Sequence, residues 1–172
     1  MRHNTRGVLL VGLFIAFEII LTRFFSIEYS ILRISFELIP IAISAILFGP
    51  ITAGVAAAVA DVLGMFIFPK GAYFPGFTLS AFISGYLFGV FLYKKKVTLF
   101  KVFLASLSVI LVVELLLKTV WLTITTQNAA MAILPVRLIK SAVFLPILSL
   151  SIYLVWKSIA PVFRKFSHID IL

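Results

Sequence analysis

Long apolar runs separated by short polar breaks fill most of this chain. The runs cover about residues 8–24, 35–48, 51–68, 77–93, 97–122 and 133–156. A helix needs about 20 apolar residues to cross a bilayer, and fewer where protein surrounds it. The second run is short and contains Pro40, so we expect it to be packed inside protein at membrane depth. The pattern predicts an all-α integral membrane protein, a six-transmembrane-helix bundle formed by a single domain over residues 1–172.

The composition supports membrane insertion and narrows the possible chemistry. Hydrophobic residues make up 63% of the chain and charged residues only 12%, whereas soluble domains carry about 25% charged residues. The chain has no cysteine, which excludes disulfides and thiolate ligands. Its two histidines, His3 and His168, stand near opposite ends of the sequence. We therefore expect no metal site.

Basic residues are distributed unevenly between the two ends of the predicted helices, and the formal net charge is +9. One side holds Arg2, Arg6, Lys94, Lys95, Lys96, Lys101, Lys157, Arg164 and Lys165. The other side holds Arg23, Arg33, Lys70, Arg137 and Lys140. Because cytoplasmic flanks are enriched in Lys and Arg, both termini are predicted to lie in the cytoplasm of a multi-pass cell-membrane protein. Without a folded polar surface, nucleic-acid binding is not expected.

Small residues recur every three or four positions in two of the runs. They are Gly54, Ala57, Ala58, Asp61 and Gly64 in 51–68, and Ala81, Gly85 and Gly89 in 77–93. Such spacing lets helix backbones approach closely in lipid, so we expect these two helices to pack tightly. Gly12 and Ala16 repeat the spacing in the first run. Their face either packs within the bundle or meets a partner protein.

Charged residues inside apolar runs are costly and by default mark function. They are Glu18, Glu37, Asp61, Glu114, Lys118, Arg137 and Lys140. Glu114 and Lys118 lie four residues apart on one helical face, which favours a structural ion pair. Pairing is also the expected role of Glu18 and Glu37.

Asp61, Arg137 and Lys140 each admit two interpretations. Asp61 either pairs with a basic residue of another helix or accepts two parallel hydrogen bonds from a ligand with adjacent N–H donors. Arg137 and Lys140 lie three residues apart, on one face at the outer end of the last run. They face either an anionic ligand or the interior acids. Trp121, on the same side, either belongs to an interfacial aromatic belt or lines a site.

The segment FPKGAYFPGF, residues 68–77, is unusually rich in aromatic and turn-forming residues. Pro69 and Pro75 stiffen the backbone, and glycines permit tight turns beneath bulky rings. The rings of Phe68, Tyr73, Phe74 and Phe77 offer flat surfaces for stacking. The segment is predicted to face outside, either as an interfacial re-entrant turn or as a lid over a binding site.

Two stretches resemble the substrate-binding (S) components of energy-coupling factor (ECF) vitamin transporters: FELIPIAISAILFGPITAGVAAAVADVLG and FPKGAYFPGFTLSAFISGYLFG. The strings YFPGFTLSA and RLIK resemble the folate-specific branch. The resemblance covers about residues 8–156. It implies a six-helix subunit that captures a vitamin from outside, gated by loops 23–33, 68–77 and 123–135. Its partners would be a transmembrane T component and two cytoplasmic ATPases, with no cofactor besides the transported folate.

The sequence lacks motifs for ATP hydrolysis and for catalysis, which is typical of a transport subunit that is not an enzyme. There is no G-x-x-x-x-G-K-[ST] phosphate loop, so ATP hydrolysis would belong to partner proteins. No nucleophile or acid–base constellation stands out. Two alternatives remain: an S component for another vitamin or precursor, and a stand-alone ion-coupled carrier of two or more copies. The carrier would use Glu18, Asp61 and Glu114 for protons, but no inverted repeat supports it.

If the ligand is folate, as the resemblance implies, each candidate residue has an expected contact. Folate carries a pterin with adjacent N–H donors, an aromatic linker and a glutamate tail. We expect Asp61 to pair with the pterin. We expect ring contacts from Tyr73, Phe77 and Trp121, and hydrogen bonds or charge from Arg137 and Lys140. Arg23 and Arg33 are expected to meet the tail near the mouth.

The resemblance also implies a gate and an interface with a partner protein. The gate residues are expected to be Phe68, Pro69, Phe74, Pro75 and Gly76. In the family, an alanine-xxx-alanine face of the first helix meets the T component. Gly12 and Ala16 match that face in size, with Gly in the first place.

Overall fold

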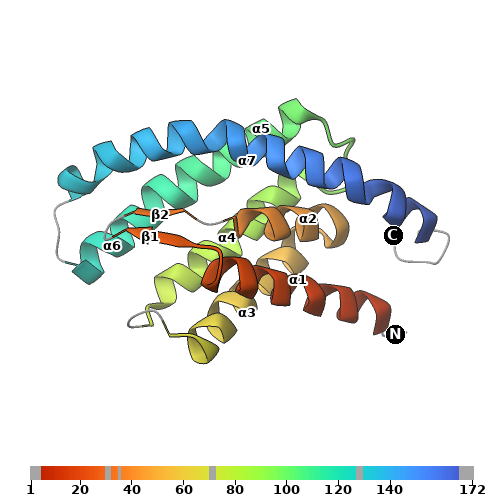
Figure 1. Cartoon of the computed structure of the whole chain (residues 1–172), viewed down its shortest axis with the longest axis horizontal. Helices are drawn as coiled ribbons and strands as arrows, with labels where there is room; N and C mark the ends of the chain where they lie inside the picture. Colours follow the sequence, from red (N-terminus) through yellow and green to blue (C-terminus); the bar gives the residue numbers. More distant parts are fainter. Residues whose placement is uncertain (1–4, 30–31, 35, 70–72, 127–129, 167–172) are drawn as a thin grey trace.

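The computed structural model describes residues 5–29, 32–34, 36–69, 73–126 and 130–166. Its elements are α1 (Thr5–Arg23), β1 (Ile27–Tyr29), β2 (Leu32–Ile34), α2 (Leu38–Phe48), α3 (Pro50–Ile67), α4 (Pro75–Leu92), α5 (Leu99–Val109), η1 (Ile110–Leu117), α6 (Lys118–Thr126) and α7 (Ala130–Phe166). The molecule is elongated (Figure 1). We call the end where α1 begins and α7 ends, together with the loop after α4, the terminal pole. The opposite end, with the β-hairpin and α6, is the hairpin pole.

The helices follow the apolar runs, with shifted ends. The run expected at 97–122 is one helical stretch made of α5, η1 and α6, and its middle part is a π-helix. The last helix extends to Phe166, well beyond the expected end at 156. The helix expected to start at 77 starts at Pro75, because proline at the first helical position has a suitable fixed φ and lacks only an N–H that would be unpaired there.

The predominantly helical prediction is confirmed, with one small exception in the loop expected at 23–33. There β1 and β2 form an antiparallel hairpin with Ile27 opposite Ile34 and Glu28 opposite Arg33. Isoleucine, leucine and tyrosine are residue types that favour a pleated strand. The hairpin was not predicted because its strands are only three residues long.

Helix α2 lies in the middle of the core. Eight of its eleven residues are buried, as expected for a helix that is apolar all round. Phe88 and Leu92 of α4 and Leu148 and Ile152 of α7 belong to the same buried cluster as α2, and Val102 and Val109 of α5 extend that cluster. All six are nearly inaccessible to solvent. The expectation that this short run lies within protein is therefore confirmed.

Helices α3 and α4 pack with their backbones almost in contact, as the small-residue spacing predicted. A Cβ added to Gly85 would lie 2.6 Å from the Ala53 carbonyl, and one added to Gly54 would lie 2.9 Å from the Phe82 carbonyl. The reversal between α2 and α3 occurs at Gly49, whose φ of +89° lies in the region that side chains disfavour. This tight pair fixes Asp61 of α3 next to the first turns of α4.

Four helical segments are long and apolar enough to cross a membrane among the residues that the structure describes. They are Pro50–Ile67, Pro75–Leu92, Leu99–Thr125 and Leu134–Pro161. Helix α2 is apolar but only 11 residues long. Much of the surface of these helices is apolar, for example Phe66, Leu116 and Ile139, as lipid contact requires.

Candidate functional site

Five charged side chains meet in the half of the molecule nearer the hairpin pole. We call them the charged cluster: Glu37, Glu114, Lys118, Arg137 and Lys140. The Lys118 ammonium lies 2.5 Å from Glu114 and 3.2 Å from Glu37. The other Glu114 oxygen lies 3.8 Å from Arg137 and 3.6 Å from Lys140. The predicted Glu114–Lys118 pair and the pairing of Glu37 are thus confirmed.

The π-helix η1 gives Arg137 a second contact with Glu114. The Lys118 N–H bonds to the Val113 carbonyl, five residues back, instead of the Glu114 carbonyl. The Arg137 guanidinium donates to this Glu114 carbonyl at 2.6 Å. π-Helical segments occur frequently at functional sites, and this one ties α7 to the middle of the preceding helix.

Of the two roles left open for Arg137 and Lys140, contact with an interior acid is the one that the structure contains. Arg137 is buried, with 7% of its surface exposed. Its guanidinium carries five N–H donors, so the contacts with Glu114 leave donors for a ligand. Lys140 also lies over the Phe144 ring, 5.9 Å from its centre.

Asp61 stands at the α3–α4 contact, where α4 supplies a polar neighbour. The Thr78 hydroxyl donates to Asp61 Oδ2 at 2.7 Å, and the Tyr73 hydroxyl lies 3.2 Å from Thr78 Oγ1. A carboxylate has about four acceptor positions, so one bond from Thr78 fixes its orientation without filling it. The three side chains form a polar patch with spare acceptor capacity.

Three aromatic rings connect the start of α4 with α6. We call Phe74, Phe77 and Trp121 the aromatic wall. Phe74 lies 5.5 Å from Trp121 and 5.9 Å from Phe77, measured between ring centres. The Trp121 indole N–H donates to Ser80 Oγ at 3.1 Å, so this ring is held within the fold. Trp121 stands on the same helical stretch as Lys118 and Glu114, and the wall therefore adjoins the charged cluster.

Gly76 makes the aromatic wall possible. A Cβ added there would lie only 2.7 Å from the Trp121 ring, so the indole packs directly on the α4 backbone. Pro75 and Gly76, expected in a loop, thus belong to the first turn of α4. They form the rigid end of the expected gate.

The rest of the expected gate lies partly outside the described residues, at Lys70, Gly71 and Ala72. Phe68 is partly exposed and packs edge-on against Phe24, with ring centres 5.1 Å apart. Pro69 and Tyr73 are exposed. Phe24 directly follows α1, so these contacts join the connections that follow α1 and α3.

The two arginines expected near the mouth occupy different places. Arg23 is buried against α3, where its Nε would lie 3.0 Å from a Cβ added to Gly64. Gly64 is one helical turn from Asp61, so Arg23 approaches the pterin end of the expected site. Arg33 belongs to β2, and its side chain lies outside the described residues.

Sequence reasoning missed Thr78 and Ser80, which hold Asp61 and Trp121 in place. Both belong to the string FTLSA, the first turn or two of α4. Hydroxyl residues early in a helix usually satisfy backbone groups nearby. Only the packing of α4 against α3 and α6 shows that these two bond to other helices.

Other expectations concern Gly12, Ala16 and metal ligands. Gly12 and Ala16 are exposed on α1, and a Cβ added to Gly12 would meet nothing within 4 Å. Among the described residues, this face therefore takes no part in packing within the chain. Among the described residues, no three His, Cys, Asp or Glu side chains gather in a way that could hold a metal ion.

Comparisons with known proteins place this arrangement in context. A folate transporter FolT from Clostridium novyi (strain NT) is 49% identical over 145 residues, covering 84% of each chain. A folate transporter FolT from Leuconostoc mesenteroides subsp. mesenteroides is 29% identical over 150 residues, covering 84% of this chain and 80% of that protein. The crystal structure of a FolT bound with folic acid superposes with a TM-score of 0.86 at 40% identity, covering 90% of this chain and 95% of that one.

The family itself is identified by a profile that spans nearly the whole sequence. The profile described as "ECF-type riboflavin transporter, S component" matches residues 2–158. That range includes every element from α1 to most of α7. The chain belongs to the family of ECF-type riboflavin transporter S components.

Proposed function

We propose that this protein is a folate-binding S component that captures folate from outside the cell. The observation that carries the proposal is the similarity to a FolT bound with folic acid, at 40% identity over 90% of this chain. The FolT relative at 49% identity points the same way. A membrane transport subunit that is not an enzyme is also what the family assignment shows.

The chemistry of the site is compatible with the two ends of folate. Asp61, oriented by Thr78, would accept the adjacent N–H donors of the pterin in two parallel hydrogen bonds. Phe77, Tyr73 and Trp121 would flank the rings. Arg137 and Lys140 would take the glutamate carboxylates, in exchange for part of their contact with Glu114.

Riboflavin is the second candidate, because the description of the matching family names it. Its ring system is also flat and also carries an imide N–H. It has no anionic group, however, so it would leave the cations of the charged cluster without a ligand carboxylate. The charged cluster therefore favours folate.

Calorimetric titration of the purified protein distinguishes these candidates. We expect saturable binding of folate near one to one, with no heat from riboflavin, thiamine or biotin. Riboflavin binding without folate binding would replace the proposal with the second candidate. Silence with every vitamin from a folded, ligand-free sample would refute the folate assignment.

Two substitutions test the site with a pterin that lacks the glutamate tail as the matched ligand. Asp61→Asn should weaken both folate and the short pterin about 10- to 100-fold, the range expected for a lost charged hydrogen bond. Arg137→Ala should weaken folate alone, since only folate carries the tail. Equal losses in Arg137→Ala would mean a structural role, and wild-type affinity in both variants would refute this site map.

The proposed topology has six spans, with both termini and the terminal pole in the cytoplasm. Two observations support it: four segments suited to spanning, and the exposed lysines of the loop after α4. The chain has no cysteine, so a thiol reagent can label only a cysteine that is introduced by substitution. An impermeant maleimide should label Phe68→Cys in intact cells and Lys96→Cys only after permeabilisation. The reverse pattern would invert the proposed orientation.

The proposed partners are a T component and two cytoplasmic ATPases. The family assignment supports them, as does the exposed Gly12–Ala16 face of α1. Uptake by this protein alone in proteoliposomes would instead support the stand-alone carrier.

A further inference from the structure

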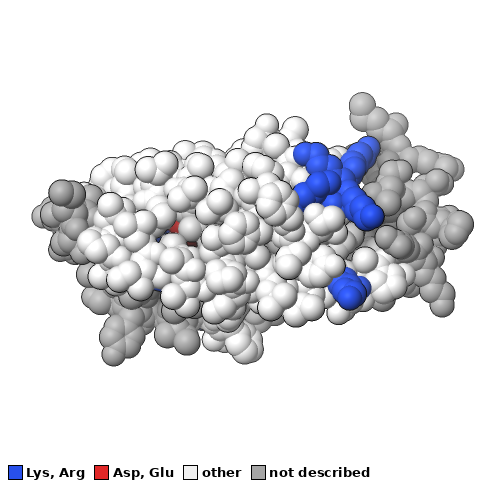
Figure 2. Space-filling model, turned by 90° about the horizontal axis from the view of Figure 1, so that it is seen from above, with Lys and Arg blue, Asp and Glu red and all other residues white. Residues whose placement is uncertain are grey.

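The terminal pole carries a strong positive charge on its surface. Figure 2 shows Lys and Arg side chains gathered at this end of the molecule. Lys94, Lys95 and Lys96 of the loop after α4 are exposed, and so is Lys157 of α7. Within the described residues, neither this loop nor the first turn of α5 nor any part of α7 contains an acid. The local charge is therefore uncompensated by the part of the chain that the structure describes.

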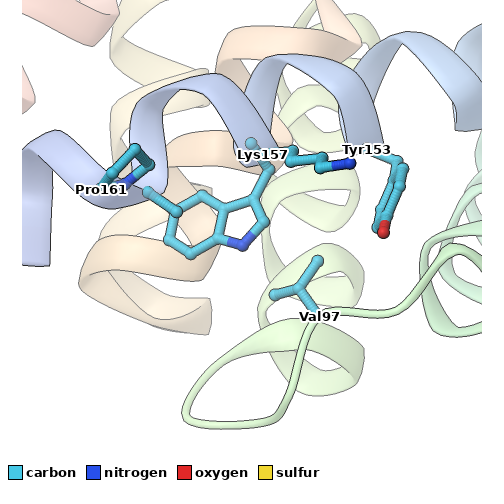
Figure 3. Close-up of a pocket in the computed structure, with 6 residues that line it drawn as sticks. Val97, Tyr153, Lys157 and Pro161 are labelled. Carbon is cyan, nitrogen blue, oxygen red and sulfur yellow. The ribbon is translucent and has the colours of Figure 1, made fainter.

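A hollow of about 250 Å³ lies at this pole between α7 and the loop after α4. It is lined by Val97, Tyr153, Trp156, Lys157, Ala160 and Pro161. The five α7 residues recur at three- and four-residue spacing, so they form one helical face. Figure 3 shows Tyr153 and Lys157 along α7, with Val97 of the loop across the hollow.

Lys157 is the cation that this hollow presents. Of the neighbouring loop lysines, Lys95 donates to the Val90 carbonyl at 2.7 Å, and Lys94 lies over the Tyr93 ring. Lys157, in contrast, makes no ion pair with any described residue and is exposed. Beside it stand a tyrosine hydroxyl and a tryptophan, the side chains typical of the boundary between bilayer and water.

The hollow also lies where a lipid headgroup would be. The apolar span of α7 runs over Leu134–Pro161, so Lys157 stands near its end. One and two turns earlier, Leu154 and Leu150 are 51% and 49% exposed. These leucines offer an exposed apolar surface next to the hollow along α7, on which an acyl chain can lie.

From this juxtaposition we propose that the hollow is a binding site for one anionic glycerophospholipid. The lipid phosphate binds Lys157 and the Tyr153 hydroxyl, the glycerol packs against Trp156 and Val97, and an acyl chain follows Leu154 and Leu150. Basic pockets at the ends of spanning helices bind anionic headgroups in this way. The proposal does not depend on the identity of the vitamin.

Native mass spectrometry of the full chain, delipidated and then mixed with equal amounts of phosphatidylglycerol and phosphatidylcholine, tests the proposal. We expect phosphatidylglycerol to be retained about fivefold better, the difference expected for one lysine near a lipid surface. Lys157→Gln should abolish the preference, whereas Lys101→Gln, at the same pole but outside the hollow, should keep it. No preference in the wild type, or an unchanged preference in Lys157→Gln, would overturn the proposal.

Fluorescence locates the lipid, because the chain has two tryptophans at opposite poles. In a Trp121→Phe background, brominated phosphatidylglycerol should quench Trp156 more strongly than brominated phosphatidylcholine does. Equal quenching would show that the lipid lies elsewhere. Excess free glycerol phosphate should not displace the lipid; if it does, the hollow is a soluble-anion site and the lipid assignment is wrong. The mass-spectrometry experiment uses no substitution at Trp121, so it still tests the proposal if the Trp121→Phe variant does not fold.

Discussion

At the scale of single residues, the candidate site depends on contacts between small or short side chains and larger ones. The Thr78 hydroxyl orients the Asp61 carboxylate, and the Ser80 hydroxyl holds the Trp121 indole. Each bond joins two different helices. The positions of the two proposed ligand-contacting groups, Asp61 and Trp121, are therefore set by α4, which supplies both hydroxyls.

Gly76 provides a test of this arrangement. In Gly76→Ala, the new methyl group would overlap the Trp121 and Phe74 rings, and overpacking of this kind costs about 1–3 kcal/mol. We expect a lower thermal unfolding temperature, a shifted Trp121 emission spectrum and weaker folate binding.

Gly12→Ala is the matched control, because its methyl group meets nothing within 4 Å. It should leave all three quantities unchanged. Wild-type stability and binding in Gly76→Ala would show that the aromatic wall is looser than the structure indicates.

At the scale of elements, the π-helix η1 joins three helices through one acidic residue. Glu114 contacts Lys118 on its own helical stretch, and it contacts Arg137 and Lys140 on α7. Lys118 in turn forms an ion pair with Glu37, the residue before α2. Because this half of the bundle is largely shielded from water, these charges depend on one another for compensation.

Glu114→Gln should therefore destabilise the protein strongly. It removes the carboxylate that contacts Lys118, Arg137 and Lys140, and removing one partner from a buried pair costs about 3–5 kcal/mol. Thermal unfolding in detergent, followed by circular dichroism, should show a clear drop in the midpoint. Lys96→Gln removes an exposed charge at the terminal pole, outside the charged cluster, and should have little effect. Similar midpoints for the two variants would mean that water already screens the charged cluster.

At the scale of the whole molecule, the two poles have different chemistry. The half nearer the hairpin pole contains the charged cluster and the aromatic wall, whereas basic side chains gather on the surface of the terminal pole (Figure 2). Between them, α1 leaves one side uncovered, with Leu9, Leu13 and Phe17 exposed beside Gly12. Such a face can bind lipid or another membrane protein.

Gly12→Leu tests whether the exposed face of α1 is needed for transport but not for folate binding. Because Gly12 contacts nothing else in the described chain, we expect normal stability and folate affinity. Copurification with the T component and ATP-driven uptake should fall, since a bulky side chain prevents close helix approach. Ile139→Phe, which enlarges an exposed apolar position on α7, should retain both. Full uptake by Gly12→Leu would remove this face from the proposed interface.

Several features followed from the sequence because they depend on local pattern alone. The apolar runs predicted the helices, and the four-residue spacing of Glu114 and Lys118 predicted their ion pair. The alternation of small residues predicted the close contact of α3 and α4. The resemblance of the block around 36–89 to S components agrees with the family assignment.

Other features escaped because they depend on which helices are neighbours. Nothing in the local sequence distinguishes Thr78 from a threonine that bonds its own helix, or indicates that Lys118 also reaches Glu37. The π-helical segment η1 could not be predicted from the sequence either, because its composition is that of an ordinary apolar helix. The contact of Arg137 with the Glu114 carbonyl appears only when α7 lies against that turn.

By itself, the sequence determined that the chain is a largely helical membrane protein, because hydropathy and helical period act over short stretches. It also determined the residue types available for binding. Only the tertiary structure decided which of them meet: Asp61 with Thr78, Trp121 with Ser80 and Gly76, and Glu114 with cations of two helices. Side-chain partnerships of this kind join residues far apart in the chain, and only the packing of whole helices brings them within bonding distance.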